Sequence, residues 1–459
     1  LSDSGAKAII ILENFAHVLE QCINDTPIEH VILTEIGDCF GVLKRNLVNA
    51  VVRHVKKMVP AHSLKNTLSF RNVVKDAMFN QFHTIPLNHD DIAFLQYTGG
   101  TTGVSKGAIL THANMLSNMQ QAYAWVNLKE GSETVVTALP LYHIFSLTAN
   151  CLVFMRVGGC NLLITNPRDI PLFIKTLKST AFTAITGVNT LFNALMNHPK
   201  FSAIDFSKLT LTLGGGMAVQ EAVAMRWKSM TGCALLEAYG LTETSPAVCV
   251  NPINLPDYNG AIGLPLPSTL VSIRRDDNSE CDLNEEGELC VKGPQVMQGY
   301  WKKPEETKRV FTPDGWLKTG DVASMDEHGY CRIVSRQKDM ILVSGFNVYP
   351  NEIEDVVVSL EGVSECAAIG VADEKSGERV KLFVVTSNDV TEADIKAHCK
   401  ANLTDYKQPK YIEFKDELPK TNVGKILHRA LRESNTNDFS ETMKETMEKK
   451  LNNTNQVPS

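Results

Sequence analysis

The chain has 459 residues, of which 43% are hydrophobic and 21% charged, an ordinary composition for a globular protein that allows roughly two to four domains. Its formal net charge of −7 gives no reason to expect general binding to nucleic acid, so an anionic ligand would need a local site. The 11 cysteines include no CxxC pair and have no regular spacing, which indicates neither a zinc site nor a disulfide framework and fits a reducing, cytoplasmic compartment.

The N-terminal part alternates between strand-like and helix-like patterns. Short apolar runs at residues 8–12 and 30–36 are each followed by a helical pattern, the second of which covers residues 42–58. This order predicts a layered α/β domain. The second helical pattern carries cations that could touch an anionic membrane surface, but its apolar face is modest and we favour a solvated face for Lys44, Arg45, Arg53, His54, Lys56 and Lys57.

A glycine-rich stretch, Tyr97 to Gly107, reads Tyr-Thr-Gly-Gly-Thr-Thr-Gly-Val-Ser-Lys-Gly. Strand patterns at residues 91–96 and 108–110 flank it, so we expect it to form the tip of a hairpin. Glycines let backbone N–H groups approach an anion, while the hydroxyls and Lys106 add donors and charge. It is not a Walker A loop, because Lys106 lies between Ser105 and Gly107. Polyphosphate binding is therefore favoured over an empty flexible hairpin.

The β-then-α order continues with a helical pattern at 112–125 and strand patterns at 135–139, 161–164, 182–185 and 209–213. Gly214, Gly215 and Gly216 follow the last strand and precede a helix from about Val219, a position where open α/β sheets bind ligands. The longest apolar run, at 144–157, is interrupted by Asn150 and Arg156 and falls short of the ~20 residues of a membrane span, so we expect a buried helix.

From about residue 260 the sequence pattern changes to short strands separated by Gly/Pro turns, which predicts a β subdomain. Beyond residue 339, two helical patterns and three strand patterns predict a small α+β domain. The last residues are polar and favour a frayed tail. We therefore expect a large domain over residues 1–337, a small domain over 338–432 and a tail over 433–459.

Four further segments combine residues suited to a nucleotide. Tyr239-Gly-Leu-Thr-Glu-Thr places a ring, a hydroxyl and a carboxylate in one turn, and Trp316-Leu-Lys-Thr-Gly-Asp ends in a carboxylate that could bind a ribose diol. The other two are Arg336 to Pro350, which crosses the expected domain boundary, and Pro419 to Leu427, which contains Lys425. Taken alone, each of the first two segments would be only an ordinary turn, and a lysine such as Lys425 is usually a solvated surface charge.

Together, the order of these segments and their amino-acid sequences resemble those of the adenylate-forming, or AMP-binding, superfamily. Within it, they resemble the bacterial long-chain fatty acyl-CoA synthetases. The resemblance covers nearly the whole chain to about Arg432, and it includes Pro140-Leu-Tyr-His-Ile-Phe and the segment Ile185 to Leu195. It implies the fold of that family, with a large layered α/β domain, a β subdomain and a small mobile α+β domain. Members usually carry on the order of one hundred further residues before this start, so we expect an N-terminally truncated or processed form.

The resemblance also assigns roles to single residues. It implies that the ATP phosphates are held by Thr98, Gly99, Gly100, Thr101, Thr102 and Lys106. Gly214, Gly215, Gly216 and Tyr239 would border the adenine, with Thr242 near the α-phosphate and Glu243 on Mg²⁺. Asp321 and Arg336 would hold the ribose, Lys425 would be the adenylation lysine and Asp339 the hinge. The acyl site would be bordered by His143, Gly187 and Val188, and the pantetheine path of CoA by Ser344, Gly345 and Phe346.

The implied activity is a long-chain fatty acid to CoA ligase that uses ATP, Mg²⁺ and CoA and proceeds through acyl-AMP. Peripheral contact with the inner face of the cytoplasmic membrane and a homodimer are both compatible with it. Two alternatives stay open: an enzyme that loads an acyl or aminoacyl adenylate onto a carrier protein, and a fatty-acid-binding homologue without catalysis. The apolar residues Leu191, Phe192 and Leu195 could border an alkyl tunnel, although such a stripe is more often core.

Overall fold

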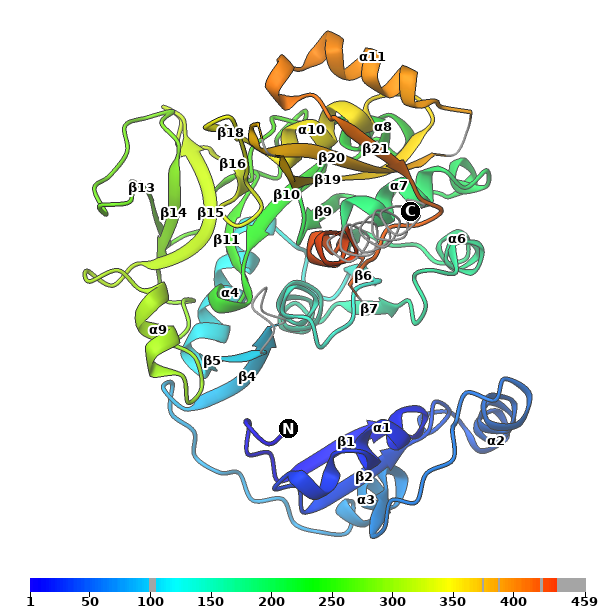
Figure 1. Cartoon of the computed structure of the whole chain (residues 1–459). Coiled ribbons are helices and arrows are strands. Elements are labelled where there is room, and N and C mark those ends of the chain that lie inside the picture. Colours follow the sequence, from blue (N-terminus) through cyan, green and yellow to red (C-terminus); the bar gives the residue numbers. More distant parts are fainter. Residues whose placement is uncertain (99–104, 374, 387–388, 422–423, 436–459) are drawn as a thin grey trace, which may run out of the picture. The chain divides into compact units, whose positions relative to one another are not determined.

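The computed structural model describes residues 1–98, 105–373, 375–386, 389–421 and 424–435. The chain divides into two compact units, Leu1–Asp91 and Ile92–Ser459 (Figure 1). No helix within the described ranges is both long enough and apolar enough to cross a membrane.

The first unit is a small parallel sheet with helices. Its strands β1 (Ala8–Leu12), β2 (His30–Thr34) and β3 (Thr67–Ser69) pair in that order, which confirms the two strands expected from the apolar runs. The connecting helices are η1 (Glu13–Phe15), α1 (Ala16–Glu20), η2 (Ile23–Asp25), α2 (Val42–Ala50), η3 (Val51–Val55) and α3 (Phe70–Ala77). The helix expected over residues 42–58 is therefore real but continues beyond Ala50 as a π-helical turn.

The second unit is built on a seven-stranded sheet with the order β12-β11-β10-β9-β8-β6-β7. Strands β7 (Cys160–Leu163), β6 (Thr134–Thr137), β8 (Ala184–Gly187), β9 (Leu211–Gly215) and β10 (Leu235–Gly240) are parallel, whereas β11 (Ala247–Val250) and β12 (Leu264–Pro265) are antiparallel additions. The parallel ends of β9 and β10 thus meet at one edge, as expected for a ligand site in a layered α/β fold.

Helices cover both faces of this sheet. On one face α6 (Ile170–Lys178), α7 (Asn189–Met196) and α8 (Glu221–Thr231) enclose the fully buried Trp227, and on the other α4 (His112–Val126) packs with α5 (Val153–Arg156). Val135 and Val136 belong to opposite clusters because successive strand residues point to opposite faces. The predicted buried helix at 144–157 is found as the π-helical η4 (Ser146–Leu152) followed by α5.

The glycine-rich stretch joins an antiparallel hairpin of β4 (Ile92–Thr98) and β5 (Lys106–Thr111), in which Thr98 is opposite Lys106. The hairpin was predicted correctly, and residues 99–104 at its tip lie outside the described ranges. An antiparallel sheet of β13 (Leu270–Arg274), β14 (Gly287–Lys292), β15 (Leu317–Met325) and β16 (Cys331–Arg336), with η6 (Thr242–Thr244) before it and α9 (Pro304–Val310) inserted, forms the expected β subdomain.

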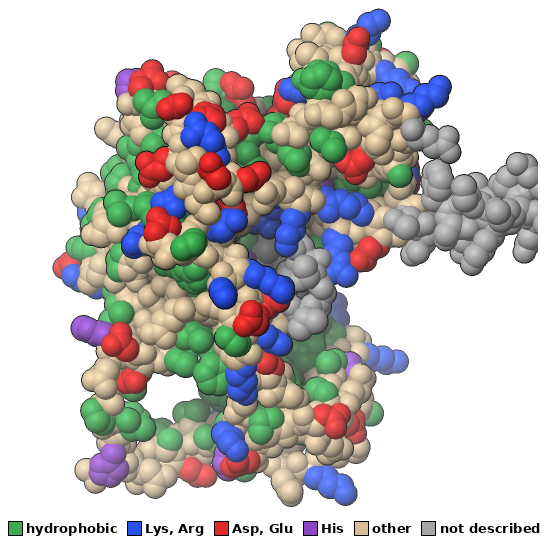
Figure 2. Space-filling model, turned by 60° about the vertical axis from the view of Figure 1, so that its left-hand side comes forward, with side chains coloured by type: hydrophobic (Ala, Val, Ile, Leu, Met, Phe, Trp, Pro, Cys, Tyr) green, Lys and Arg blue, Asp and Glu red, His purple; other side chains and the backbone are tan. Residues whose placement is uncertain are grey.

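The C-terminal part has its own core. Strands β17 (Ile341–Val343), β18 (Phe346–Val348), β19 (Val363–Asp373), β20 (Gly377–Thr386) and β21 (Tyr411–Phe414) form one sheet, with α10 (Pro350–Val358), α11 (Glu392–Asn402) and η7 (Asp405–Lys407). Buried residues of the sheet and of both long helices, such as Val384, Ile353 and Ile395, share one cluster. The small α+β composition was predicted; most of the polar tail, residues 436–459, lies outside the described ranges. On the face drawn in Figure 2, hydrophobic side chains are interspersed with both signs of charge.

Candidate functional site

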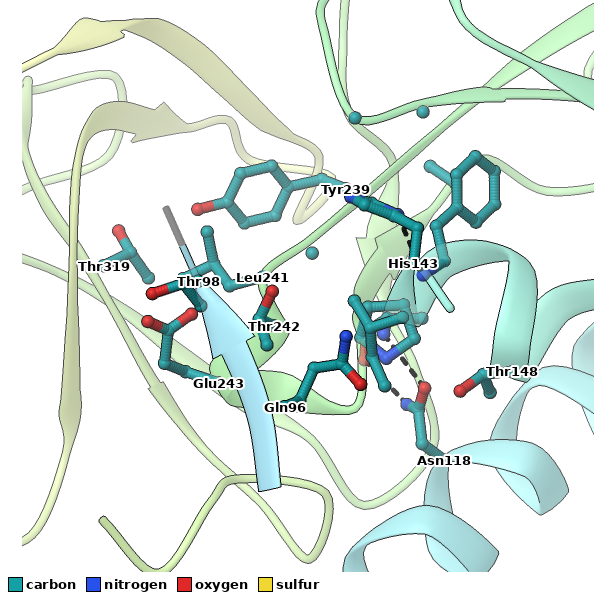
Figure 3. Close-up of a pocket in the computed structure, with 18 of the residues that line it drawn as sticks. Gln96, Thr98, Asn118, His143, Thr148, Tyr239, Leu241, Thr242, Glu243 and Thr319 are labelled. Carbon is teal, nitrogen blue, oxygen red and sulfur yellow. Dashed lines mark hydrogen bonds between the residues drawn. The ribbon is translucent and has the colours of Figure 1, made fainter. Parts of the chain in front are cut away.

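A cavity of about 680 Å³ opens in the second unit at the carboxyl ends of β9 and β10. Polar residues line one part of it: Thr98, Lys106, Tyr239, Thr242, Glu243, Thr319, Arg336 and Lys425. Apolar residues from α4, η4 and the sheet line another part: Ala122, Trp125, Val126, Leu139, Phe145, Ala149, Val188, Leu213 and Val250. Figure 3 shows Thr98, Thr242, Glu243 and Thr319 on one side, with Asn118 and Thr148 on the other. The cavity can hold a ligand with a charged end and an alkyl end.

Lys106 leaves the hairpin tip with its ammonium group directed at α9. It forms an ion pair with Glu306, and its Nζ lies 5.2 Å from the centroid of the Tyr300 ring. The Lys106 ammonium lowers the pKa of the Glu306 carboxyl. An anionic ligand at the hairpin must therefore compete with this carboxylate.

The end of β10 brings Tyr239 to the cavity, and the turn after this strand brings Thr242 and Glu243. Gly240 is required there, because a Cβ at this position would lie 1.9 Å from the Pro246 carbonyl oxygen. The Tyr300 hydroxyl donates to Glu243 Oε1 at 2.7 Å. Burial, followed by the nearby Glu243 charge, raises the pKa of Tyr300, so this hydroxyl stays protonated and keeps the carboxylate oriented.

A buried carboxylate contacts two of the residues that line the polar part, although it is not itself among the lining residues. Asp321, only 2% exposed, is opposite Arg336 across β15 and β16, and its Oδ1 forms an ion pair with Arg336 Nε at 3.1 Å. The Tyr239 hydroxyl donates to Oδ2 at 2.5 Å. Burial and the Asp321 charge both raise the pKa of Tyr239. Asp321 therefore fixes Tyr239 and Arg336 in place, and both of these residues line the cavity.

Lys425 reaches the same cavity from a turn in the C-terminal part. The turn is closed by two hydrogen bonds between Thr421 and Lys425, and Thr190 of the large sheet region donates to the Gly424 carbonyl at 3.2 Å. Burial, together with the nearby Arg336 charge, lowers the pKa of the Lys425 ammonium to about 8. An anionic ligand that enters the cavity would stabilise the protonated, cationic form of this half-buried lysine.

His143 lies beside the lysine. Its Nδ1 accepts from the Phe145 backbone N–H at 3.3 Å, and burial followed by the Lys425 charge lowers the pKa of its ring. At neutral pH the imidazole is uncharged, which suits a position between the polar and the apolar parts of the cavity.

The three glycines at the end of β9 do not all face the cavity. Gly215 and Gly216 line the cavity, and a Cβ on Gly215 would lie 2.9 Å from the Ala238 carbonyl oxygen. Gly214 faces the core instead, where a Cβ would lie 2.5 Å from Val219. Likewise, Val188 lines the cavity and Gly187 does not, while Phe192 and Leu195 are fully buried in the core.

Some expected site residues lie away from the cavity. Asp339 forms an ion pair with Arg432. Ser344 and Gly345 form the β17–β18 turn with positive φ angles, and the Phe346 ring stacks on Tyr406 with centroids 4.9 Å apart. Gly99, Gly100, Thr101 and Thr102 lie outside the described residues, so the structure says nothing of their place.

Several lining residues were not predicted from the sequence. Tyr300 donates a hydrogen bond to Glu243, although the two residues are 57 positions apart in the sequence. Gln96 donates to the Tyr142 carbonyl at the cavity wall. Ala122, Trp125 and Val126 have the spacing of one helix face, which predicts burial but not which cavity they line. Thr319 stands within the Trp316 to Asp321 motif and could have been singled out there.

Comparisons with known proteins show to which family the chain belongs. The model of the AMP-binding enzyme family matches residues 1–301, and that of the AMP-binding enzyme C-terminal domain matches residues 352–425. A long-chain-fatty-acid–CoA ligase of Escherichia coli O157:H7 is 56% identical over 94% of this chain and 78% of its own length.

Solved structures share the fold. ATP-bound MatB from Rhodopseudomonas palustris has a TM-score of 0.75 at 31% identity, covering 91% of this chain and 81% of that one. The anthranilate CoA ligase AuaEII with anthranoyl-AMP has a TM-score of 0.83 at 25% identity, covering 96% and 80%. The family match spans well over half of the chain, and the fold agrees with it. The chain therefore belongs to the AMP-binding enzyme family.

Proposed function

We propose that this protein activates long-chain fatty acids with ATP and transfers the acyl group to CoA, releasing AMP and pyrophosphate. The observation that carries the proposal is a single cavity in which Lys106, Arg336 and Lys425 converge near an apolar wall. The identity to long-chain-fatty-acid–CoA ligases supports the substrate class.

Each polar group has a role in binding ATP. Lys106 and the hairpin would hold the outer phosphates, and Tyr239 with Gly215 and Gly216 would border the adenine. Arg336, fixed by Asp321 at 3.1 Å, would lie against the ribose. Thr242 would contact the α-phosphate. In this assignment the positively charged side chains lie near the phosphates, and the edge of the sheet binds the adenine.

Glu243 fits a Mg²⁺ site of the kind that substrate phosphates complete. Mg²⁺ keeps several waters and needs one or two carboxylates when it binds with phosphates, and Glu243 is a carboxylate at the cavity. Among the described residues no group of three or more His, Cys, Asp or Glu could hold a metal ion alone. When bound, the ion would neutralise phosphate charge. The Tyr300 hydroxyl would keep Glu243 oriented for it.

In the first half-reaction a carboxylate oxygen of the fatty acid attacks the α-phosphorus, and the bond to pyrophosphate breaks. The result is acyl-AMP, which makes the acyl carbon a good electrophile because AMP is a much better leaving group than oxide. The protein contributes mainly by positioning and by charge. Lys425 and Lys106 stabilise the developing negative charge on the phosphates.

In the second half-reaction the CoA thiol attacks the acyl carbonyl, AMP leaves and the thiol proton passes to solvent or base. A thiol needs a path to the acyl carbon, whereas in this arrangement Lys425 lines the cavity in which that carbon would lie. We therefore propose that the small domain, residues 338–432, rotates about Asp339 and brings the turn of Ser344, Gly345 and Phe346 to the cavity. Sheet boundaries support this division, because β16 ends at Arg336 and β17 begins another sheet at Ile341.

The apolar wall is the proposed acyl site. His143 and Val188 would border it near the acyl carbon, and the α4 residues Trp125 and Val126 would contact the chain further on. Peripheral contact with the inner face of the cytoplasmic membrane belongs to the same proposal, because long-chain fatty acids concentrate in bilayers. A homodimer is proposed as well.

The test separates the two half-reactions. Fatty-acid-dependent ATP–pyrophosphate exchange measures the first, and thioester formation from supplied acyl-AMP measures the second. Lys425→Ala should abolish exchange and spare thioester formation. Similar losses in both steps would contradict the assigned role, and no exchange by the unaltered protein with any fatty acid would contradict the activity.

The acceptor and the chain length are tested together. A series of fatty acids of increasing length, each with free CoA or with acyl-carrier protein as the thiol, should give the highest thioester yield with long chains and CoA. A preference for the carrier protein would instead favour a carrier-loading enzyme.

A further inference from the structure

The apolar part of the cavity runs down one face of the seven-stranded sheet. Gly240 of β10 is opposite Ala247 of β11, and two residues deeper in β10 Ala238 is opposite Val250; all four line the cavity. Leu213 of β9, whose partner in β10 is two residues deeper again, lines it as well. At about 3.3 Å per residue, these levels cover roughly 13 Å of the sheet.

Helix α4 forms a second wall of similar length. Asn118, Ala122, Trp125 and Val126 line the cavity and share one side of the helix, because residues three and four positions apart are neighbours. From Asn118 to Val126 the helix rises by about 12 Å. We call the space between this side of α4 and the sheet the apolar arm.

Contacts between α4 and the β11 chain show in which direction the apolar arm runs. Asn118 Nδ2 donates to the Ala247 carbonyl at 2.8 Å, and its Oδ1 accepts from the Ala247 N–H at 2.9 Å, four residues after Glu243 of the polar part (Figure 3). Another four residues along the chain, the Asn251 carbonyl accepts from Trp125 Nε1 at 3.2 Å. The apolar arm therefore begins beside the polar part and ends at the indole of Trp125.

The indole is held in this place. Trp125 is partly buried and packs against the cluster that contains Val250. Asn251 is 2% exposed, and its own side chain donates to the Ala261 carbonyl at 2.6 Å and accepts from Asn259 at 3.1 Å. Moving the indole aside would break its bond to a buried residue, which is costly because a buried acceptor does not find water in its place.

We propose that Trp125 forms the end of the apolar arm and is the residue that sets the longest acyl chain that this protein accepts. The inference rests on the proposed function, because it names the residue that limits the substrate of that same site. A chain that ends short of the indole leaves apolar surface unfilled, and each methylene that fills it strengthens binding. A chain that reaches past the indole must bend or displace it, as in an overpacked core.

The test is the chain-length profile of kcat/KM in fatty-acid-dependent ATP–pyrophosphate exchange, measured with saturated acids in one detergent. Trp125→Ala opens the end of the apolar arm. The optimum should then move by about two to four carbons toward longer acids, since each methylene advances by about 1.3 Å in a chain with bonds of about 1.5 Å. The ratio of kcat/KM at the new optimum to that at the old one should be about tenfold or more higher than in the unaltered protein, because each further buried methylene gives a roughly fourfold gain.

A second variant acts in the opposite direction and leaves the end wall in place. Ala122→Leu adds bulk about one helix turn before Trp125. The optimum should therefore move toward shorter acids. This variant removes no side chain from the core, so the proposal stays testable if Trp125→Ala does not fold.

Two matched controls separate the end wall from general effects on α4. Trp125→Phe keeps a large ring at the end of the apolar arm and should shift the optimum less than Trp125→Ala does. Tyr123→Ala removes a ring of the same helix that lies 4.8 Å from Arg156 and does not line the cavity, so it should leave the optimum unchanged. Circular dichroism and thermal melting show whether each variant is folded.

Binding without turnover gives an independent measurement. In the absence of ATP and CoA, a long-chain fatty acid brominated in its outer half should quench the fluorescence of Trp125 more than the same acid brominated next to its carboxyl group. The chain has four tryptophans, so the Trp125 signal is the difference between the unaltered protein and Trp125→Phe.

An unchanged optimum in either folded variant, Trp125→Ala or Ala122→Leu, would overturn the proposal. Equal quenching by the two brominated acids would overturn it as well, and so would a loss in Trp125→Ala that is the same for every chain length, because the indole would then only support the core. Absence of exchange by the unaltered protein with any fatty acid would contradict the proposed function instead, and the quenching would still test the position of Trp125.

Discussion

At the scale of single residues, Lys425 has the property that is easiest to measure. Burial and Arg336 lower the pKa of its ammonium to about 8. The charged form exists below this pH, and the proposed stabilisation of phosphate charge needs that form. Acyl-AMP formation should therefore fall as the pH rises through about 8.

The measurement is kcat/KM for ATP in pyrophosphate exchange from about pH 6.5 to about pH 9.5, because this ratio reports groups of the free enzyme. In Lys425→Arg the alkaline loss should disappear at a lower plateau, since a guanidinium stays charged over this range. An alkaline limb that survives in the arginine variant would assign the titration to another group.

Glu306 gives a second prediction. Its carboxylate pairs with Lys106 and also accepts from Arg309 at 3.2 Å, so it neutralises the lysine that we propose to hold the outer phosphates. Glu306→Gln should lower KM for ATP and strengthen inhibition by pyrophosphate, each by roughly two- to tenfold, as expected for a partly exposed pair.

Initial rates at varied ATP and pyrophosphate test this effect. The control is Glu305→Gln, which removes the neighbouring exposed carboxylate on α9 with little expected change. Weaker ATP binding in the Glu306 variant would mean that the carboxylate positions Lys106 for the nucleotide and does not compete with it.

The sequence predicts site residues that belong to a short recognisable motif. It does not predict site residues that act by contacting a residue far away in the chain. Glu243 and Lys425 stand out in their motifs and both reach the cavity. Tyr300 and Glu306 look like ordinary residues of a turn and a helix. Their role appears only when folding places them on Glu243 and Lys106.

At the scale of secondary structure, apolar runs predicted the strands well because the central strands are buried on both faces. The 144–157 run shows the limit. Its pattern predicts one buried helix, but η4 carries buried polar side chains: Thr148 donates to the Ser245 carbonyl at 2.7 Å and Asn150 Oδ1 accepts from Thr186 at 2.9 Å. A hydrophobic pattern does not contain these partners, so it cannot predict a π-helical turn.

A buried carboxyl on β10 gives a prediction at this scale. Burial, with the nearby Asp355 charge also acting, raises the pKa of the Glu237 carboxyl to about 8. The folded state thus holds a proton that the unfolded chain has released above about pH 4.5. The stability that this carboxyl contributes is present at low pH and is lost as the pH rises toward 8.

Glu237→Gln keeps the acceptor for the Val219 backbone N–H and removes the titration. It should therefore stabilise the protein by roughly 2–4 kcal/mol at pH 8 and much less at pH 5, a difference of several degrees in Tm. Thermal unfolding at both pH values measures this difference. Glu221→Gln, an exposed carboxylate on α8, is the control, and an equal shift at both pH values would assign the effect to packing.

At the scale of the whole molecule, the second unit shows how its proposed large and small domains are joined. Thr190 donates to the Gly424 carbonyl at 3.2 Å, Asn193 donates to the Ser364 carbonyl at 3.1 Å, and Tyr349 donates to Glu286 at 2.7 Å. The two sheets were predictable from their patterns. These contacts were not, because each joins a side chain to a backbone carbonyl or carboxylate far away in the chain.

The contacts at Thr190 and Asn193 hold the arrangement in which Lys425 lines the cavity, and a rotated small domain would lose both. Interactions made in only one of two arrangements shift the equilibrium between them. Thr190→Val/Asn193→Ala should therefore depopulate the arrangement needed for adenylation. Two hydrogen bonds of about 1 kcal/mol each correspond to a roughly tenfold or larger slowing of pyrophosphate exchange.

Thioester formation from supplied acyl-AMP should be unchanged or faster in the same variant, because under the proposed rotation this step uses the other arrangement. Thr176→Val is the control, since that hydroxyl donates only to the Leu172 carbonyl of its own helix at 2.9 Å. Parallel slowing of both half-reactions, with the control unaffected, would mean that these contacts stabilise the site as a whole. Domain rotation would then not be what separates the two steps.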